Sequence, residues 1–142
     1  MTDETYTISI IPPNRVREVW SRARPHLQRA IKVSNGRWTS DYVLASLVLN
    51  EQQLWVTINS KDEIIGAVTT QVACYPERTM LAIHFLGGDD FDGWYEYLLA
   101  TLLRYAKDAG CDGIECVARN GFWKWFKRDG FEKDSSFYEK KA

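Results

Sequence analysis

The amino-acid sequence predicts an α/β fold of the mixed α+β kind, in which one mixed sheet carries helices on its faces. Segments that alternate apolar and polar residues are interleaved with segments whose apolar residues recur every three or four positions. Short turns join three consecutive strands within 53–86, which favours antiparallel pairing among them. The strand, helix and strand of 79–118 form a crossover unit, which favours parallel pairing.

The predicted order of elements is β-α-α-β-β-β-α-β-α-β. In chain order these elements lie at 5–11, 14–31, 39–48, 53–59, 63–74, 79–86, 95–106, 112–118, 121–128 and 136–140. The 142 residues suit one domain, which we expect to span 1–142. Hydrophobic residues make up 45% and charged residues 26%, which are globular proportions and argue against disorder or a coiled coil.

Proline, glycine and capping residues fix several of these boundaries. Pro12 and Pro13 end the first strand, because proline lacks the N–H donor that a strand ladder needs. Pro25 falls inside the first helical stripe and predicts a kink or a break into two short helices. Thr39 can cap the second helix, and Gly110 can end the third in a left-handed conformation.

Charge and hydropathy narrow the class of protein. The formal net charge of −1 is too small for a protein that coats nucleic acid by charge alone. No apolar run has the length of a membrane helix, and the first residues do not resemble a signal peptide, so we expect a cytoplasmic location without membrane contact. Residues 14–37 are strongly basic, and this segment can either meet a phosphate-bearing partner or offset the acidic middle of the same domain.

The cysteines Cys74, Cys111 and Cys116 form no C-x-x-C pair and have no histidine at zinc-ligand spacing. We therefore expect no metal site, and we expect small buried side chains in a reducing compartment. A catalytic thiol would need a base, for which the sequence offers only His26 and His84.

The element order and two segments resemble the GNAT superfamily of acyl-CoA N-acyltransferases. Residues 83–116, IHFLGGDDFDGWYEYLLATLLRYAKDAGCDGIEC, resemble the family's fourth strand, phosphate turn, long helix and fifth strand. Residues 118–131, ARNGFWKWFKRDGF, resemble its last helix, which ends in Gly-Phe. The length, the Gly-Gly turn and the Arg-x-Gly-Phe segment are most similar to the small GNAT-like proteins of tailed phages.

The resemblance implies a sheet that opens between its fourth and fifth strands and holds an acyl-CoA there, with acetyl-CoA as co-substrate and no metal. It places Leu86, Gly87 and Gly88 at the turn whose backbone N–H groups hold the pyrophosphate. Unpaired N–H groups and the positive end of a helix dipole favour an anion at such a place. Arg119 can pair with a phosphate as a bidentate donor or can be an ordinary surface arginine.

The chain departs from the family pattern at this turn. The basic turn Gln/Arg-x-x-Gly-x-Gly/Ala is absent, and Asp89, Asp90 and Asp92 surround the helix start instead. These carboxylates would repel a pyrophosphate, since like charges 4 Å apart at an effective dielectric of about 20 repel by roughly 4 kcal/mol. One of them can equally serve as an ordinary helix cap.

A second departure concerns the proton donor. The family often places a tyrosine in the last helix, where its hydroxyl protonates the leaving thiolate. The corresponding residue here is Phe126, which has no proton to give, and Tyr138 is the available substitute. The loss of a general acid costs about 10²–10⁴-fold in rate, which weakens the enzyme hypothesis without removing it.

His84 and Glu115 are the candidate bases. His84 lies on the expected fourth strand, and an unperturbed pKa of about 6.5 suits deprotonation of an amine. Glu115 lies on the next strand, where its neighbours Ile114 and Cys116 indicate that it points to the opposite face from them. The alternatives are a histidine packed with one backbone hydrogen bond and a glutamate that faces solvent.

The sequence is compatible with three functions. The first is an acyl-CoA-dependent N-acyltransferase that uses acetyl-CoA as donor and acts on a small-molecule or protein amine. The second is a non-catalytic binding or assembly protein of the same fold, of phage origin, which the lost motif details favour. The third is a nucleic-acid-associated module that uses the arginines of 15–37. The aromatic and basic residues of 121–128 fit the third function if they face solvent and core packing if they face the sheet.

Overall fold

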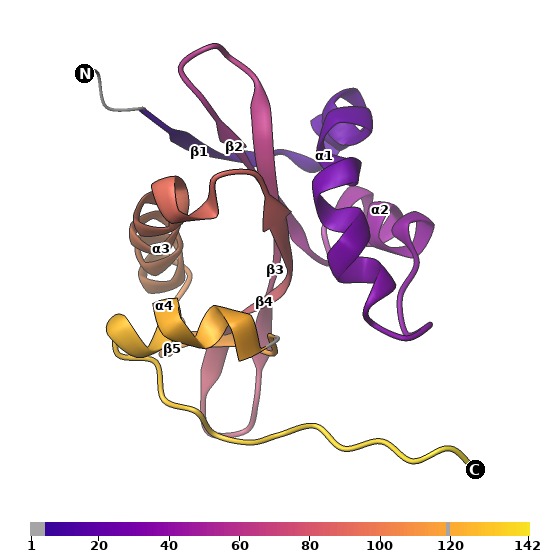
Figure 1. Ribbon diagram of the computed structural model, residues 1–142, viewed down its shortest axis with the longest axis vertical. Helices are drawn as coiled ribbons and strands as arrows, with labels where there is room; N and C mark the ends of the chain where they lie inside the picture. The colour runs from indigo at the N-terminus through magenta and orange to yellow at the C-terminus, as the bar shows by residue number, and fades with distance from the viewer. Residues whose placement is uncertain (1–4, 119) are drawn as a thin grey trace.

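The computed structural model describes residues 5–118 and 120–142 and places a sheet between two layers of helices (Figure 1). The strands are β1 (Thr7–Ile11), β2 (Gln53–Ile58), β3 (Ile64–Cys74), β4 (Thr79–Gly88) and β5 (Gly113–Cys116). The helices are α1 (Val16–Lys32), α2 (Ser40–Val48), α3 (Phe91–Asp108) and α4 (Trp123–Arg128), with short 3-10 turns η1 (Pro13–Arg15) and η2 (Asn120–Phe122).

The five strands lie in their sequence order, β1-β2-β3-β4-β5. The pairs β1–β2, β2–β3 and β3–β4 are antiparallel, and β4–β5 is parallel. Hairpins can join antiparallel neighbours, whereas the parallel pair needs the α3 crossover. The predicted mixed sheet is therefore confirmed.

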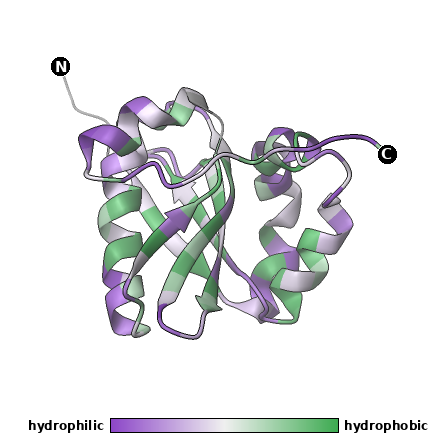
Figure 2. Ribbon diagram, turned by 90° about the horizontal axis from the view of Figure 1, so that it is seen from below, coloured by the Kyte–Doolittle hydropathy of each residue, from purple (hydrophilic) through white to green (hydrophobic). Residues whose placement is uncertain are grey.

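Each face of the sheet carries its own hydrophobic core. Figure 2 shows helices on both sides of the sheet, with hydrophobic stretches in the strands and in the helices of each side. Leu27 and Leu47 anchor the α1–α2 layer, and Trp94 and Leu102 anchor the α3 layer, all with at most 1% exposure. Burial of one such side chain contributes about 1.5–3 kcal/mol, so the two layers hold the sheet from both sides.

Local signals set most helix ends as predicted. The Thr39 hydroxyl accepts a hydrogen bond from the Tyr42 N–H at the start of α2. Gly110, just after α3, has a φ of 76°, which is typical of a left-handed helix cap. The predicted break of the first helix is wrong, because α1 runs through Pro25 as one helix. A proline inside a helix costs about 3 kcal/mol, and burial of Ala23 and Leu27 on the same helix offsets this cost.

The predicted strand at 136–140 is absent. Residues 131–142, all within the described part of the chain, form neither helix nor strand. Phe137 and Tyr138 are adjacent, so a strand would send them to opposite faces and neither face would be apolar. Both side chains are exposed instead, at 71% and 89%.

Within residues 5–118 and 120–142, no helix combines the length and the apolar character that crossing a membrane requires.

Gly66 of β3 lies directly beneath the indole of Trp94, and a Cβ at this position would stand 2.6 Å from Trp94 Cζ2. Because that ring is fully buried, it has no space to retreat, and we predict that Gly66→Ala lowers the free energy of unfolding by about 1–3 kcal/mol. Gly121→Ala is the control, since a Cβ there meets no atom within 4 Å of the described residues, and it should change stability by less than about 0.5 kcal/mol. Urea unfolding measures both, and equal effects would contradict the packing described.

Candidate functional site

The two parallel strands separate partway along β4. Pairing between β4 and β5 runs from Met80 opposite Gly113 to Ile83 opposite Cys116, and no later pair joins them among the described residues. The other edge of β4 stays paired with β3 as far as Gly88. The end of β4 therefore has one free edge, on the side where β5 has left the sheet.

A β-bulge sits where the strands separate. Thr69 pairs with Phe85 and Thr70 with Ile83, so His84 is the extra residue on β4. A bulge turns two successive side chains to the same side of a sheet. Phe85 belongs to the core beneath α1 and α2, and His84 lies on that side too, with its ring 5.9 Å from the Trp38 ring.

Leu86, Gly87 and Gly88 belong to β4 rather than to a turn, which corrects the sequence prediction. The Asp89 N–H donates to the Ile65 carbonyl at 2.7 Å. Because hydrogen-bonded and non-hydrogen-bonded positions alternate along an antiparallel pair, the N–H groups of Leu86 and Gly88 point away from β3 and that of Gly87 points toward it. The amides at Leu86 and Gly88 thus face the free edge.

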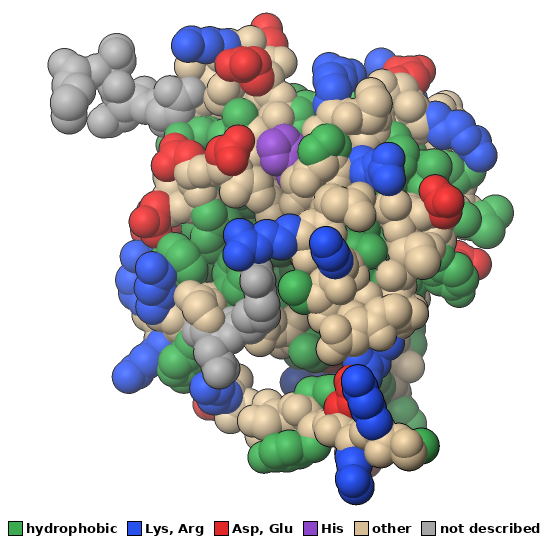
Figure 3. Space-filling model, turned by 45° about the vertical axis from the view of Figure 1, so that its right-hand side comes forward, with side chains coloured by type: hydrophobic (Ala, Val, Ile, Leu, Met, Phe, Trp, Pro, Cys, Tyr) green, Lys and Arg blue, Asp and Glu red, His purple; other side chains and the backbone are tan. Residues whose placement is uncertain are grey.

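A cavity of about 360 Å³ adjoins this edge. Leu86, Gly87 and Gly88 line it from β4, and Arg29 of α1 lies on one side. Phe91, Phe122 and Trp125 form an aromatic wall on the other side, with the Phe91 and Trp125 ring centroids 5.0 Å apart. Figure 3 shows Lys and Arg side chains across the middle of the face turned toward the viewer, with acidic side chains mainly at its margins.

Arg29 and the glycine packing were not identified from the sequence. Gly87 lies against the backbone carbonyl of His26, and a Cβ at this glycine would collide with that carbonyl. The His26 Nε2 in turn lies 3.0 Å from the Ile64 carbonyl, which ties α1 to β3 beside the cavity. The basic stripe of α1 was the available signal for Arg29, but only the fold shows which of its arginines reaches β4.

The aspartates at the start of α3 are engaged away from the helix amides. Asp90 occupies the N-cap position with a left-handed φ of 54°, yet its side chain caps nothing and accepts a hydrogen bond from the Tyr6 hydroxyl. Asp92 accepts a hydrogen bond from the Trp125 indole N–H and links α3 to α4. The expectation of an ordinary cap at Asp90 is therefore wrong, because Tyr6 binds its carboxylate.

His84 and Glu115 lie on the same face of the sheet. Glu115 pairs in register with Ala82, and its neighbours Ile114 and Cys116 pack against the opposite, α3 core, as predicted. The Glu115 carboxylate accepts a hydrogen bond of 2.6 Å from the Tyr75 hydroxyl. Burial lowers the pKa of His84, and the Glu115 carboxylate opposes this shift.

The partner of His84 is a side chain rather than the backbone. Its Nε2 lies 2.8 Å from Oε1 of Gln71 on β3, a contact that the sequence did not suggest. Gln71 pairs in register with Ala82, and Ala82 pairs with Glu115, so three strands contribute polar side chains near the bulge.

The residues considered as proton donors to the leaving thiolate, and the tyrosine near them, differ in their exposure to solvent. Phe126 is buried and stacks against Phe122, and Tyr138 is 89% exposed in the C-terminal segment. Tyr95 lies beside Phe126, with ring centroids 6.3 Å apart, and burial together with the Asp129 carboxylate raises the pKa of its hydroxyl. The Arg119 prediction lies outside the described residues.

The cysteines are free thiols. Burial raises the pKa of Cys116 to about 12, which keeps this thiol protonated and poorly nucleophilic. The expectation of buried cysteines is wrong for Cys74, which is exposed at the end of β3, and Cys111 and Cys116 are only partly buried.

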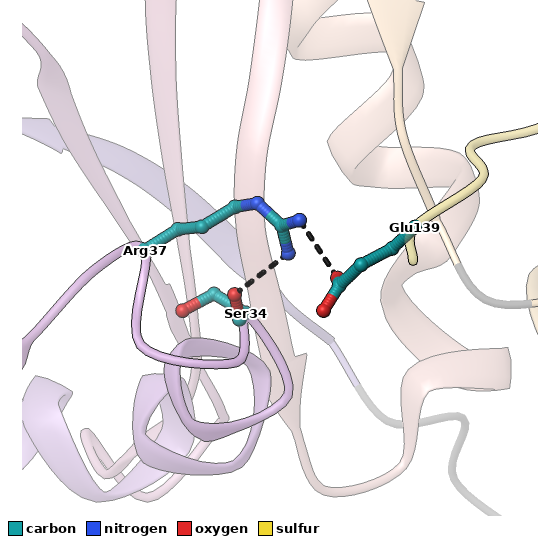
Figure 4. Close-up of polar contacts among 3 residues, drawn as sticks. All are labelled: Ser34, Arg37 and Glu139. Carbon is teal, nitrogen blue, oxygen red and sulfur yellow. Dashed lines mark hydrogen bonds and ion pairs between the residues drawn. The ribbon is translucent and has the colours of Figure 1, made fainter. Parts of the chain in front are cut away.

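The C-terminal segment crosses from the α4 side toward the α1–α2 loop (Figure 1). Figure 4 shows Arg37 of this loop between the Ser34 carbonyl and the carboxylate of Glu139, which it binds at 2.8 Å. The Arg37 guanidinium also lies 4.7 Å from the centroid of the Phe137 ring. The segment is therefore held to the loop that carries Trp38, the neighbour of His84.

Neither the family models nor the curated proteins contain a match to this chain. Solved structures do resemble it. An aminoglycoside acetyltransferase from an uncultured soil metagenomic sample has a TM-score of 0.73 at 13% identity, covering 97% of this chain and 99% of that one. The ribosomal-protein-alanine N-acetyltransferase of Brucella melitensis has a TM-score of 0.70 at 12% identity, covering 97% and 99%. The chain has the GNAT acetyltransferase fold.

A third GNAT structure shares this architecture. A predicted acetyltransferase from Clostridium acetobutylicum, solved with acetyl-CoA, has a TM-score of 0.67 at 14% identity, with 96% of each chain covered. At identities this low, the structural similarity establishes a common fold and nothing more specific. On this fold the chain carries an Asp-rich start of α3, Arg29 at the cavity and Gln71 beside His84.

The lowered pKa of His84 makes a prediction about stability. Below the ordinary pKa of 6.5, unfolded His84 binds more protons than folded His84, so unfolding becomes easier as the pH falls through this window. We expect the free energy of unfolding of the wild type to decrease from pH 7.5 to pH 5.5 more steeply than that of His84→Gln, since the variant lacks this titration. Urea unfolding at each pH measures the two slopes, and parallel slopes would contradict the burial of His84.

Proposed function

We propose that the chain is an acyl-CoA-dependent N-acyltransferase, with acetyl-CoA as acyl donor and an amine as acceptor. The observation that carries this proposal is the free edge of β4, where the Leu86 and Gly88 amides face a cavity of about 360 Å³. Backbone N–H groups without strand partners are suited to hold the polar groups of an extended ligand. Backbone amides can polarise the carbonyl of a bound thioester. His84 precedes Leu86 by two residues on β4, and the histidine that lines the cavity itself is His26.

The proposed anion site draws its positive charge from α1. Arg29 lies at the cavity beside Gly87 and Gly88 and takes the place of the basic turn that this chain lacks. Asp90 and Asp92 accept hydrogen bonds from Tyr6 and Trp125 and keep their negative charge, so Arg29 has to supply the positive charge that a phosphate needs there. A guanidinium is a bidentate donor to phosphate oxygens, so Arg29 suits the pyrophosphate.

The proposed chemistry uses His84 as the base. Acyl-CoA, when bound, supplies the acyl group as a thioester. His84 takes a proton from the acceptor ammonium, the amine nitrogen forms a bond to the acyl carbon, and the carbon–sulfur bond breaks. The attacking nitrogen gives up its second proton to water, and the leaving thiolate takes a proton from water, because Phe126 stands where a tyrosine would donate one. Glu115 is the second candidate base, on the same face as His84.

The acceptor is proposed to be a small-molecule or protein amine. Similar structures include an aminoglycoside acetyltransferase and a ribosomal-protein-alanine N-acetyltransferase, so proteins of this fold serve both kinds of amine. The Trp38 side chain adjoins His84, and the loop that carries Trp38 also holds the C-terminal segment through Arg37. We expect the amine to approach from this side.

Arg29→Gln tests the anion site. We predict that calorimetric titration detects binding of CoA to the wild type and an affinity about tenfold weaker for Arg29→Gln, since a charge-assisted hydrogen bond is lost. Arg22→Gln removes the same charge from α1 without touching the cavity and should leave the affinity unchanged. A wild type that does not bind CoA at millimolar concentration would contradict the proposed function, and equal weakening by both variants would remove Arg29 from the site.

His84→Gln tests the base. We expect turnover of an amine with acetyl-CoA to fall by about 10²–10⁴-fold while the affinity for CoA is kept, because the imidazole acts on the acceptor. Glu115→Gln is measured in parallel. A large loss in Glu115→Gln with normal turnover in His84→Gln would assign the base to Glu115.

A further inference from the structure

The side chain of Gln71 forms a hydrogen bond with the imidazole of His84. Its Oε1 lies 2.8 Å from His84 Nε2, and both side chains are half-buried on the α1–α2 side of the sheet. Strand alternation makes this contact, because Gln71 stands opposite Ala82 and His84, two residues further along β4, points to the same face.

We propose that Gln71 is a positioning residue that fixes the tautomer of His84, so that Nδ1 is the atom that accepts the proton. This inference rests on the proposed role of His84 as the base. A carboxamide oxygen can only accept a hydrogen bond, so the His84 Nε2 facing it carries the hydrogen. In a neutral imidazole the other nitrogen then holds the free electron pair. The acyl acceptor therefore meets Nδ1.

A neutral partner suits a base better than a charged one at this place. A carboxylate at position 71 would stabilise the imidazolium and raise the pKa of His84, so that more of the histidine would already be protonated near neutral pH. Gln71 orients the ring without adding charge. Glu115 on β5 is the charged group that acts on His84, and its carboxylate is engaged by the Tyr75 hydroxyl.

The strand framework explains why Gln71 can hold the ring in one orientation. Gln71 pairs with Ala82 of β4, and it directly follows Thr70, which is paired with both β2 and β4. The Trp38 ring covers His84 from the α1–α2 loop at 5.9 Å. The imidazole is thus bounded by Gln71 on one side and by an indole on another.

Nitrogen-15 NMR of the histidine side chains reads the tautomer directly. The chain has two histidines, and His84→Gln assigns their signals. His26 is an internal reference, because its Nε2 faces the Ile64 carbonyl, which can only accept, and must carry the hydrogen. Above its pKa, we expect His84 of the wild type to show the same tautomer as His26, with hydrogen on Nε2.

Two substitutions of Gln71 test the assignment. Gln71→Leu should reduce the preference for the Nε2–H tautomer and lower kcat by roughly fivefold, the value of one neutral hydrogen bond, with the KM for acetyl-CoA unchanged. Gln71→Glu keeps the accepting oxygen, so the tautomer should be retained while the pKa of His84 and the pH profile of kcat move upward. Gln53→Leu is the matched control, since Gln53 bonds Thr70 and should leave His84 unaffected.

The outcomes separate this inference from the proposed function. An Nδ1–H tautomer in the wild type, or a His84 pKa that does not rise in Gln71→Glu, would overturn the role of Gln71 whether or not the protein is active. The expected tautomer and pKa shift in a protein that transfers no acyl group would instead support the Gln71 contact and contradict the proposed function. Because Gln71→Glu is nearly isosteric, it keeps the test decisive if Gln71→Leu does not fold.

Discussion

The separation of β4 from β5 after Ile83 governs the rest of this structure. A strand inside a sheet has its backbone N–H and C=O groups satisfied on both edges, whereas the last residues of β4 are paired only with β3. Polar backbone groups of this kind need a partner, from protein, solvent or ligand. The cavity beside Leu86 and Gly88, the bulge at His84 and the approach of α1 all lie at the place where β5 leaves the sheet.

Charge at this place is distributed across elements that are distant in sequence. The start of α3 is acidic, and α1 is basic, so that Arg29 of α1 faces the end of β4 while Tyr6 and Trp125 bind the aspartates. Gly87 makes the contact between α1 and β4 possible, because any side chain there would meet the His26 carbonyl. The local sequence of the β4–α3 connection therefore understates how well this end of the molecule can accept an anion.

Periodicity predicted the sheet and the helices because the elements are long and amphipathic. It failed at 136–140, where Phe137 and Tyr138 lie among charged residues and fasten to the α1–α2 loop through Arg37 instead. Leu86–Gly88 was predicted as a turn because two consecutive glycines before aspartates are typical of turns. The pairing of Gly87 and Gly88 with β3, which carries β4 through them, is not visible in the local sequence. His84 and Glu115 were identifiable by type, but Gln71 meets His84 only through the pairing of β3 with β4, and Arg29 meets the end of β4 only through the packing of α1. The resemblance to tailed-phage proteins stays a prediction.

The most direct test follows the backbone amides of β4 by nitrogen-15 NMR during a titration with CoA. The alternation along β4 predicts that the Leu86 and Gly88 N–H signals move strongly, whereas that of Gly87, which points toward β3, moves little. A titration that binds CoA yet leaves Leu86 and Gly88 unperturbed, or that perturbs only residues remote from this edge, would contradict the central claim that the opened strand holds the ligand.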